Sequence, residues 1–330
     1  MPSLTGRFLN SRNNSKYEQI FTHITTCSAI NSYIIFTFSL LAKSTGKAQP
    51  KHVFYFIHAI LHYFLRSPVH SYRYGVRPGF VSVIKMKIDV ILTPAELPVL
   101  KKADLSKTAC IVFDVLRATS TFVTALNNGA KSVIPVSTIS EAVALRKKQP
   151  DLLLGGEREG LKIKATQSAP EFDLGNSPRE YTPDKVKDKT IVSTTTNGTL
   201  ALEACTKGGI VLAASFLNLS ATASFLRHLQ MEEILMVCAG TGKTAALEDV
   251  LAAGALCDLL IGTFSDSAQI ARTAYAYAES DLGAAVCNSE NARRLLAAPE
   301  LRGDVSYCLR VDAIDIVAVM GTDNAIRVLV

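Results

Sequence analysis

The chain has few features of a metal-binding or disulfide-bonded cysteine protein. None of its seven cysteines stands in a Cys-x-x-Cys pair, which disfavours a zinc ribbon or a dithiol redox site. Most of them lie in apolar runs such as residues 235–239, where a buried, reduced thiol is the ordinary state. This pattern indicates a cytoplasmic protein without a disulfide framework.

Acidic residues are almost absent from residues 1–85, which contain Glu18 alone against ten Lys and Arg. Residues 86–330 contain 25 basic and 28 acidic side chains, so the basic balance of the chain belongs to its front segment. It therefore does not indicate a nucleic-acid partner. Five of the six histidines and 14 of the 24 Phe and Tyr residues also lie in the first 85 positions. We predict that residues 1–85 form an aromatic, basic extension outside the working enzyme.

Long hydrophobic runs are also missing. The two apolar stretches of the front segment, residues 29–42 and 52–65, are shorter than the ~20 residues that cross a bilayer. No stable membrane span is expected, and the late start of the first stretch disfavours a signal peptide. Three interpretations of residues 1–85 stay open: an over-extended translation start with Met86 as the working initiator, a targeting or membrane-surface extension, and an accessory domain.

From Met86 onward, β-branched runs alternate with helical patterns, as in an α/β fold. We predict mixed or parallel sheets flanked by helices, in two α/β subdomains with the site between them. A polar loop near residues 156–188 would divide these subdomains within the domain 86–330. The expected strands are 87–92, 109–115, 132–136, 151–154, 190–194, 210–214, 233–238 and 313–319. The expected helices are 119–128, 140–148, 198–205, 220–229 and 247–261, with helical stretches over 266–296.

Four segments place polar residues directly after an apolar strand, where open α/β sheets bind ligands. They are residues 113–121, 155–158, 194–199, and 238–243 with Glu248 and Asp249 beyond. Any one of them is compatible with ordinary turn chemistry. Together they supply carboxylates and anion-binding groups, which favours one shared site.

The residue types in these segments suit metal-assisted phosphate chemistry. Asp114 can hold a hard cation while Arg117, three residues on, binds a phosphate or sulfonate. Glu157 and Arg158 repeat that pairing after two glycines. The turn at Thr196 and Asn197 offers hydroxyl and backbone N–H groups at a helix start. Magnesium held by carboxylates would activate water, and the basic groups would stabilise the transition state.

Several other catalytic motifs are absent. The end of a P-loop is suggested at residues 241–244, but its first glycine position is occupied by Val237. Cys110 stands too far from Arg117 for a cysteine phosphatase loop, and Leu116 occupies the place of the second aspartate of a haloacid dehalogenase type phosphatase. His228, the only histidine beyond residue 85, falls late in a helix and is expected at the surface.

In this order, the four segments resemble those of the 2-phosphosulfolactate phosphatase family. A further segment, Phe172-Asp173-Leu174-Gly175-Asn176-Ser177-Pro178, belongs to the same resemblance, which runs from Met86 to near the C-terminus. The resemblance implies hydrolysis of 2-phospho-3-sulfolactate to 3-sulfolactate and phosphate with Mg²⁺. In methanogens this step belongs to coenzyme M biosynthesis.

The residues and the resemblance together give a set of expected roles. The expected catalytic residues are Asp114, Glu157 and Asp249. The expected metal ligands are Asp114, Glu157, Glu248 and Asp249. The expected substrate-binding residues are Arg117, Arg158, Asn176, Ser177, Thr196, Asn197 and Lys243. Which carboxylate acts as base, nucleophile or ligand stays open, including an aspartyl-phosphate on Asp114.

Two alternatives to this function stay open as well. The link at residues 162–171 is longer than is usual in the family, so the substrate can be another small phosphorylated hydroxy acid. A non-catalytic anion-binding module is the second alternative, and the intact carboxylates argue against it. The Ala-rich helix 251–257 could pack closely against a second copy, so a homo-oligomer is also open.

Overall fold

The structure is a computed structural model that describes residues 86–167, 169–229 and 231–329. The predictions for residues 1–85 fall outside the described residues. In the part of the chain that is described, no helix is long and apolar enough to cross a membrane.

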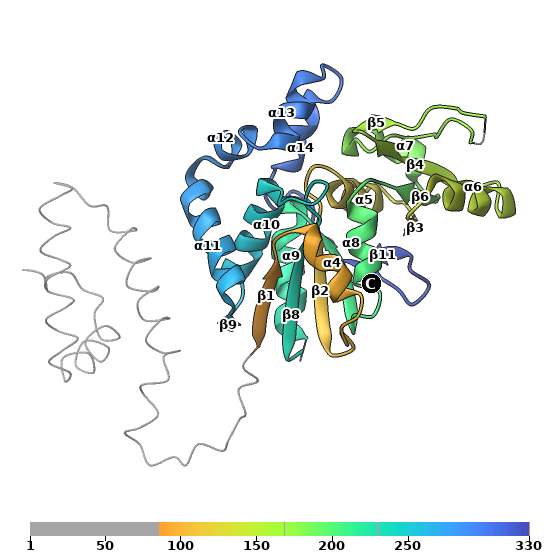
Figure 1. The fold of residues 1–330 in the computed structure, drawn as a ribbon. Helices are drawn as coiled ribbons and strands as arrows, with labels where there is room; N and C mark the ends of the chain where they lie inside the picture. The colour runs from red at the N-terminus through yellow and green to blue at the C-terminus, as the bar shows by residue number, and fades with distance from the viewer. Residues whose placement is uncertain (1–85, 168, 230, 330) are drawn as a thin grey trace, which may run out of the picture. The chain divides into compact units, whose positions relative to one another are not determined.

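One mixed sheet of eleven strands runs through the described residues (Figure 1). Its strand order is β5-β4-β6-β3-β11-β10-β7-β2-β8-β1-β9. The strands are β1 (Lys87–Ile91), β2 (Thr108–Phe113), β3 (Ser132–Pro135), β4 (Leu153–Arg158), β5 (Leu161–Lys162), β6 (Thr190–Thr194), β7 (Ile210–Ala214), β8 (Glu233–Cys238), β9 (Thr263–Phe264), β10 (Ala318–Met320) and β11 (Ile326–Val328).

The sheet consists of two parallel blocks joined by an antiparallel hairpin. Strands β9, β1, β8, β2 and β7 form the larger block, and β3, β6 and β4 form the smaller one. Between them, β10 and β11 pair antiparallel with each other and with their neighbours β7 and β3. The predicted α/β class with a mixed sheet and flanking helices is confirmed, and the two blocks are compatible with two subdomains.

Helices pack on both faces of the larger block. Ile111 and Phe113 of β2 share a core with residues of α9, α10 and α11. The alternating Cys110 and Val112 face the other core, with residues of α5 and α8. The helices are α4 (Leu97–Leu100), α5 (Ala118–Asn127), α6 (Ile139–Lys148), α7 (Pro183–Val186), α8 (Gly198–Ala204), α9 (Leu219–His228), α10 (Leu247–Asp258), α11 (Asp266–Ala278), α12 (Leu282–Cys287), α13 (Glu290–Ala297) and α14 (Arg302–Cys308). Short 3-10 turns are η3 (Pro94–Glu96), η4 (Pro178–Glu180), η5 (Phe216–Asn218) and η6 (Glu279–Asp281).

The Ala-rich part of α10 packs inside its own chain. Residues 251–257 are all buried. A Cβ atom at Gly254 would lie 2.2 Å from the carbonyl oxygen of Ala271 in α11, so the two helices approach closely where glycine leaves room. This segment is therefore not available to a second copy, and the oligomeric state stays open.

The observed elements differ from the predicted ones in several places, and the short elements α4, α7, β5 and β9 were not predicted. Strand β4 continues through Gly155 and Gly156 to Arg158, because both glycines pair with β6 and Glu157 pairs with β5. Polar residues expected after the strand thus lie on the strand itself. One strand was predicted at 313–319, whereas the structure has the hairpin β10–β11. Helix α14 was not predicted.

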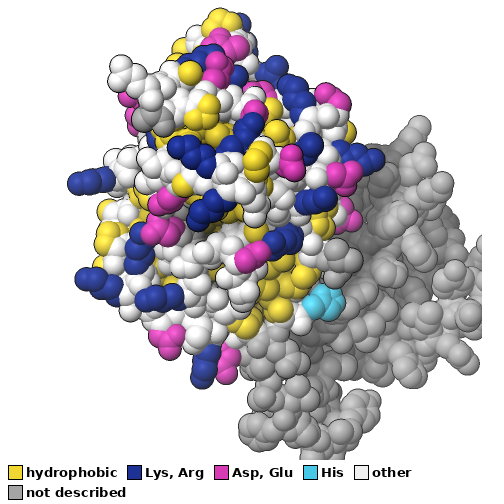
Figure 2. All heavy atoms as spheres, turned by 90° about the vertical axis from the view of Figure 1, so that its right-hand side faces the viewer, with side chains coloured by type: hydrophobic (Ala, Val, Ile, Leu, Met, Phe, Trp, Pro, Cys, Tyr) yellow, Lys and Arg dark blue, Asp and Glu magenta, His cyan; other side chains and the backbone are white. Residues whose placement is uncertain are grey.

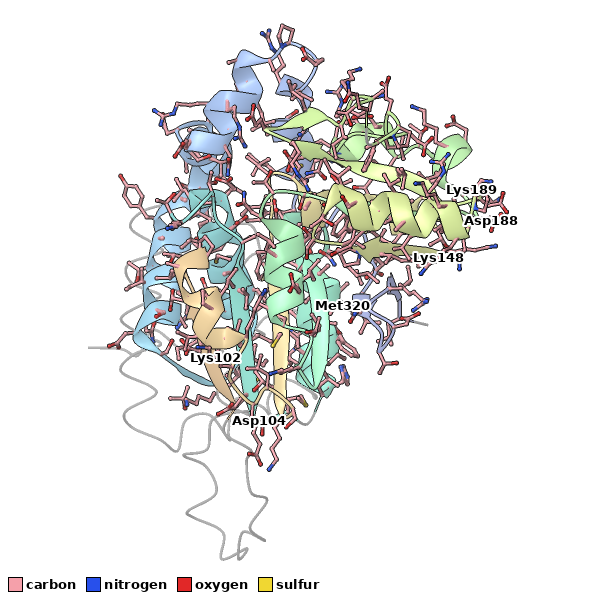
Figure 3. The ribbon with its side chains drawn as sticks, turned by 45° about the vertical axis from the view of Figure 1, so that its right-hand side comes forward. Lys102, Asp104, Lys148, Asp188, Lys189 and Met320 are labelled. Carbon is pink, nitrogen blue, oxygen red and sulfur yellow. The ribbon has the colours of Figure 1, made fainter. Side chains whose placement is uncertain are left out.

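The amino ends of the two blocks lie at separate places in the molecule. Figure 3 shows Asp104, which precedes β2, at the lower end of the ribbon drawn for the described residues. Lys189, immediately before β6, lies at the far right end of the same view, beside Asp188 and Lys148. Helices α12, α13 and α14 lie above the ends of the larger block (Figure 1).

Candidate active site

Loops from the carboxyl ends of both blocks are joined by hydrogen bonds. The guanidinium of Arg117, after β2, donates through Nη2 to the carbonyl oxygen of Gly160, after β4, at 2.6 Å. The amide of Gly242, after β8, donates to Oδ1 of Asn197, after β6, at 3.2 Å. The four predicted segments therefore meet in one region, as expected from their places at the strand ends.

Asp249 connects the ends of β2 and β8. It lies in the first turn of α10, where a helix favours a negative charge. Its Oδ1 accepts from the amide of Val115 at 2.8 Å, and its Oδ2 accepts from the amide of Gly240 at 3.0 Å. Burial and the neighbouring Asp114 and Glu248 raise the pKa of the Asp249 carboxyl well above its ordinary value.

Glu157 connects the ends of β4 and β6 in the same way. Its Oε1 accepts from both the amide and the hydroxyl of Thr196, each at 2.8 Å. Its Oε2 accepts from the amide of Gly160 at 2.7 Å. These contacts give Glu157 and Asp249 a role in holding the loops, and their expected part in catalysis or metal binding stays a prediction.

Asp114 lies at the start of α5, buried between three loops. Its Oδ1 accepts from the amide of Ala118 at 3.1 Å. A Cβ atom on Gly198 would lie 2.5 Å from its Oδ2, so only glycine fits opposite the carboxylate. Burial, followed by repulsion from Glu157 and Glu248, raises the pKa of Asp114 to about 6.

Glu248 has one carboxylate oxygen without a partner. The residue is 1% exposed. Its Oε1 accepts from Nδ2 of Asn291 at 2.8 Å, whereas its buried Oε2 accepts no hydrogen bond from the described residues. A buried carboxylate oxygen left without a partner costs free energy, so it indicates a missing ligand.

Arg117 is held in a buried ion pair. Its Nη1 donates to Oδ2 of Asp304 in α14 at 2.8 Å, and both side chains are buried. Oδ1 of Asp304 accepts from the hydroxyl of Ser177 at 2.6 Å and lies 3.6 Å from Nη1 of the half-exposed Arg179. The structure thus places Arg117 and Ser177 together around a carboxylate, and their expected contact with substrate stays a prediction.

The remaining predicted substrate residues border the same region. Arg158 donates to the carbonyl of Glu157 at 2.7 Å and to Oγ1 of Thr194 at 2.9 Å. Asn176 is buried, and its Oδ1 has no partner among the described residues. Lys243 lies exposed in the turn between Thr241 and Thr244, whose backbones pair with each other.

Charged side chains of both signs cover the surface beside the smaller block. Figure 2 shows Lys and Arg interspersed with Asp and Glu on this face, with hydrophobic side chains between them. The described residues on this face form no extended area of one charge.

The carboxylates of the site fit a magnesium ion. Among the residues described, no three His, Cys, Asp or Glu side chains are arranged to hold a metal. Magnesium does not require three, because it commonly takes one or two carboxylates together with waters and substrate phosphate oxygens. Glu248 has a free oxygen, and the mutual repulsion of Asp114 and Glu248 would be relieved by a cation. These two residues fit the ion best.

Three polar residues of the site were missed by the sequence analysis. They are Asn291 and Arg294 of α13 and Asp304 of α14. None follows an apolar strand, which was the signal used to find the others. His228, in contrast, is exposed late in α9, as predicted.

Comparisons with known proteins identify the family. A profile of the 2-phosphosulpholactate phosphatase family matches residues 92–323. A curated protein of Thermotoga petrophila, named "Probable 2-phosphosulfolactate phosphatase", is 42% identical over 226 residues, which cover 68% of this chain and 91% of that protein. A protein of the same name from Carboxydothermus hydrogenoformans is 38% identical over 238 residues, covering 70% and 92%. The chain therefore belongs to the 2-phosphosulpholactate phosphatase family.

Proposed function

We propose that this protein is a Mg²⁺-dependent phosphatase that hydrolyses 2-phospho-3-sulfolactate to 3-sulfolactate and phosphate. The observation that carries the proposal is the unpartnered Oε2 of Glu248, buried beside Asp114 where the loops of the two blocks meet. The names of the relatives supply the substrate. We assign the activity to residues 86–330 of a cytoplasmic protein, and its product would enter coenzyme M biosynthesis where that pathway exists.

Asp114 and Glu248 are the residues that would hold the ion. A bound magnesium ion would lower the charge on the phosphate and polarise water. Arg158, at the end of β4, and Lys243, in the turn after β8, are the basic side chains that would bind the anionic groups of the substrate. Glu157 and Asp249 would keep the loops in place.

The chemical step needs a base and a leaving group. Without a cation, burial and the neighbouring carboxylates raise the pKa of Asp114 to about 6, so this carboxyl is more basic than an ordinary aspartate and can accept a proton. Asp114 would take the proton of the attacking water as the new oxygen–phosphorus bond forms. The bond between phosphorus and the C2 oxygen breaks, and that oxygen takes up a proton from solvent.

The test is phosphate release from racemic 2-phospho-3-sulfolactate by the full chain, with Mg²⁺ and with EDTA. Turnover should require Mg²⁺ and should be lost in Glu248→Gln, whereas the exposed Glu279 can be changed to Gln without effect. Turnover that continues in EDTA would contradict the metal dependence. If the enzyme prefers 2-phospholactate or phosphoglycolate, its substrate is another phosphorylated hydroxy acid.

A further inference from the structure

Asn291 forms three hydrogen bonds at the edge of the site. It belongs to α13, and only 5% of its surface is exposed. Its Nδ2 donates to Oε1 of Glu248 at 2.8 Å and to Oγ1 of Thr241 at 2.7 Å. Its Oδ1 accepts from Nη2 of Arg294 at 3.0 Å. One amide therefore contacts α10, the turn after β8 and its own helix.

These partners allow only one orientation of the amide. Arg294 has donors and no acceptor, so Oδ1 has to face it. Oε1 of Glu248 accepts from the amide, so Nδ2 has to face that side. Turning the amide over would place two donors together at Arg294 and two acceptors together at Glu248. Arg294 thus fixes the direction in which Asn291 donates.

The result for Glu248 is an asymmetric carboxylate. One oxygen is held by Asn291, and the other stays buried without a partner. Outer hydrogen bonds of this kind orient metal ligands in proteins, and their removal commonly weakens metal binding about 10- to 100-fold. A ligand held by only one oxygen keeps the other in a fixed position for a cation.

We propose that Asn291 is a positioning residue that presents Glu248 to the divalent cation, with Arg294 locking the Asn291 amide. This inference rests on the proposed function, because it assumes that Glu248 binds the ion. It gives α13 the role of orienting Glu248, which no residue of the strand-end segments fulfils. The same amide also ties the turn at Thr241 to α13.

A purely structural role for Asn291 predicts a different result. In that case its removal would lower stability and leave the cation affinity of the folded protein unchanged. Cation binding measured without substrate separates the two roles. Mn²⁺ is a suitable probe because carboxylate sites accept it in place of Mg²⁺ and its binding can be followed by electron paramagnetic resonance.

The experiment titrates the full chain and its variants with Mn²⁺, and repeats the titration with Mg²⁺ by calorimetry. Asn291→Ala should weaken binding about 10- to 100-fold. Arg294→Ala, at an exposed position that tolerates truncation, should weaken it less but measurably. Arg293→Ala removes the adjacent exposed arginine and should leave the affinity unchanged. Thermal unfolding of each variant shows that the protein titrated is folded.

The outcomes are distinct. Wild-type affinity in both Asn291→Ala and Arg294→Ala, in a chain that binds Mn²⁺, would overturn this inference and leave the proposed function standing. A wild-type chain that binds neither cation would overturn the metal dependence of the proposed function and this inference with it. Weakened binding in both variants, with Arg293→Ala unchanged, supports the positioning role.

Discussion

The raised pKa of Asp114 predicts an unusual dependence of stability on pH. In the unfolded chain this carboxyl titrates near 3.8, whereas in the folded protein it titrates at about 6. The folded state therefore holds the proton more tightly, and the stability from the protonated carboxyl is complete below pH 3.8. This stabilisation is lost as the pH rises through about 6. The difference between the two pKa values corresponds to about 3 kcal/mol of unfolding free energy in total.

The assay is urea unfolding of the full chain in EDTA between pH 4 and pH 7.5, for wild type and Asp114→Asn. The free energy of unfolding of wild type, minus that of the variant, should fall by about 2–3 kcal/mol over this range, because the unfolded carboxyl is already partly ionised at pH 4. The pKa of Asp249 is raised as well, in part by the charge of Asp114. Asp114→Asn removes that charge and so lowers the pKa of Asp249. The stability of the variant therefore depends even less on pH. Asp315→Asn, at an exposed position, is the matched control and should follow wild type.

A difference that stays constant with pH would refute this reasoning, because it would mean that Asp114 is neither desolvated nor crowded by Glu157 and Glu248. Added Mg²⁺ gives a second test of the same charge. Since a cation binds the ionised carboxylate, Mg²⁺ should stabilise wild type more at pH 7.5 than at pH 5. Equal stabilisation at both pH values would exclude Asp114 from the cation site.

Two further substitutions test other contacts of the site. Asp304→Ala leaves the buried Arg117 without its carboxylate partner and should lower the free energy of unfolding by about 3–5 kcal/mol. The double variant Asp304→Ala with Arg117→Met should lose less unfolding free energy than the sum of the two single losses. Urea unfolding measures both, and additive losses would show that the pair is not coupled. Gly198→Ala places a methyl group against Asp114 and should lower stability by about 1–3 kcal/mol and abolish phosphate release. Wild-type turnover in that variant would show that Asp114 can shift without consequence.

The strand-end segments could be predicted from sequence because their signals are local. Asp114 follows an apolar strand, and the hydroxyl of Thr119, in the first turn of the helix, donates back to its carbonyl oxygen at 2.9 Å. Parallel pairing then brings the ends of β2 and β8 to one edge and the ends of β4 and β6 to another, whatever the lengths of the connections between them. The alternation of strands and helices was sufficient to predict the α/β class and the meeting of the segments within each block. The meeting of the two blocks depends on the antiparallel hairpin β10–β11 between them, which was not predicted.

The polar contacts made by the C-terminal helices could not be predicted in the same way. Asp304 and Arg117 are 187 positions apart, and nothing in the composition around Asp304 distinguishes it from a surface residue on a short helix. The assignment of roles among the carboxylates also depends on contacts that a motif does not contain. Asp249 and Glu248 are adjacent in sequence, yet only Glu248 has a buried oxygen without a partner.

The balance of charge at the site indicates an order of binding. Four buried carboxyl groups surround the site, and the one buried cation among the predicted substrate residues, Arg117, is paired with Asp304. Without a metal ion, this arrangement would repel a substrate that carries phosphate, sulfonate and carboxylate groups, because like charges in a poorly solvated region interact strongly. We therefore expect the cation to bind before the substrate. In this order, Asn291 of α13 first positions Glu248 for the cation. The exposed Lys243 and the partly buried Arg158 bind the substrate only after the cation has offset the negative charge of the carboxylates.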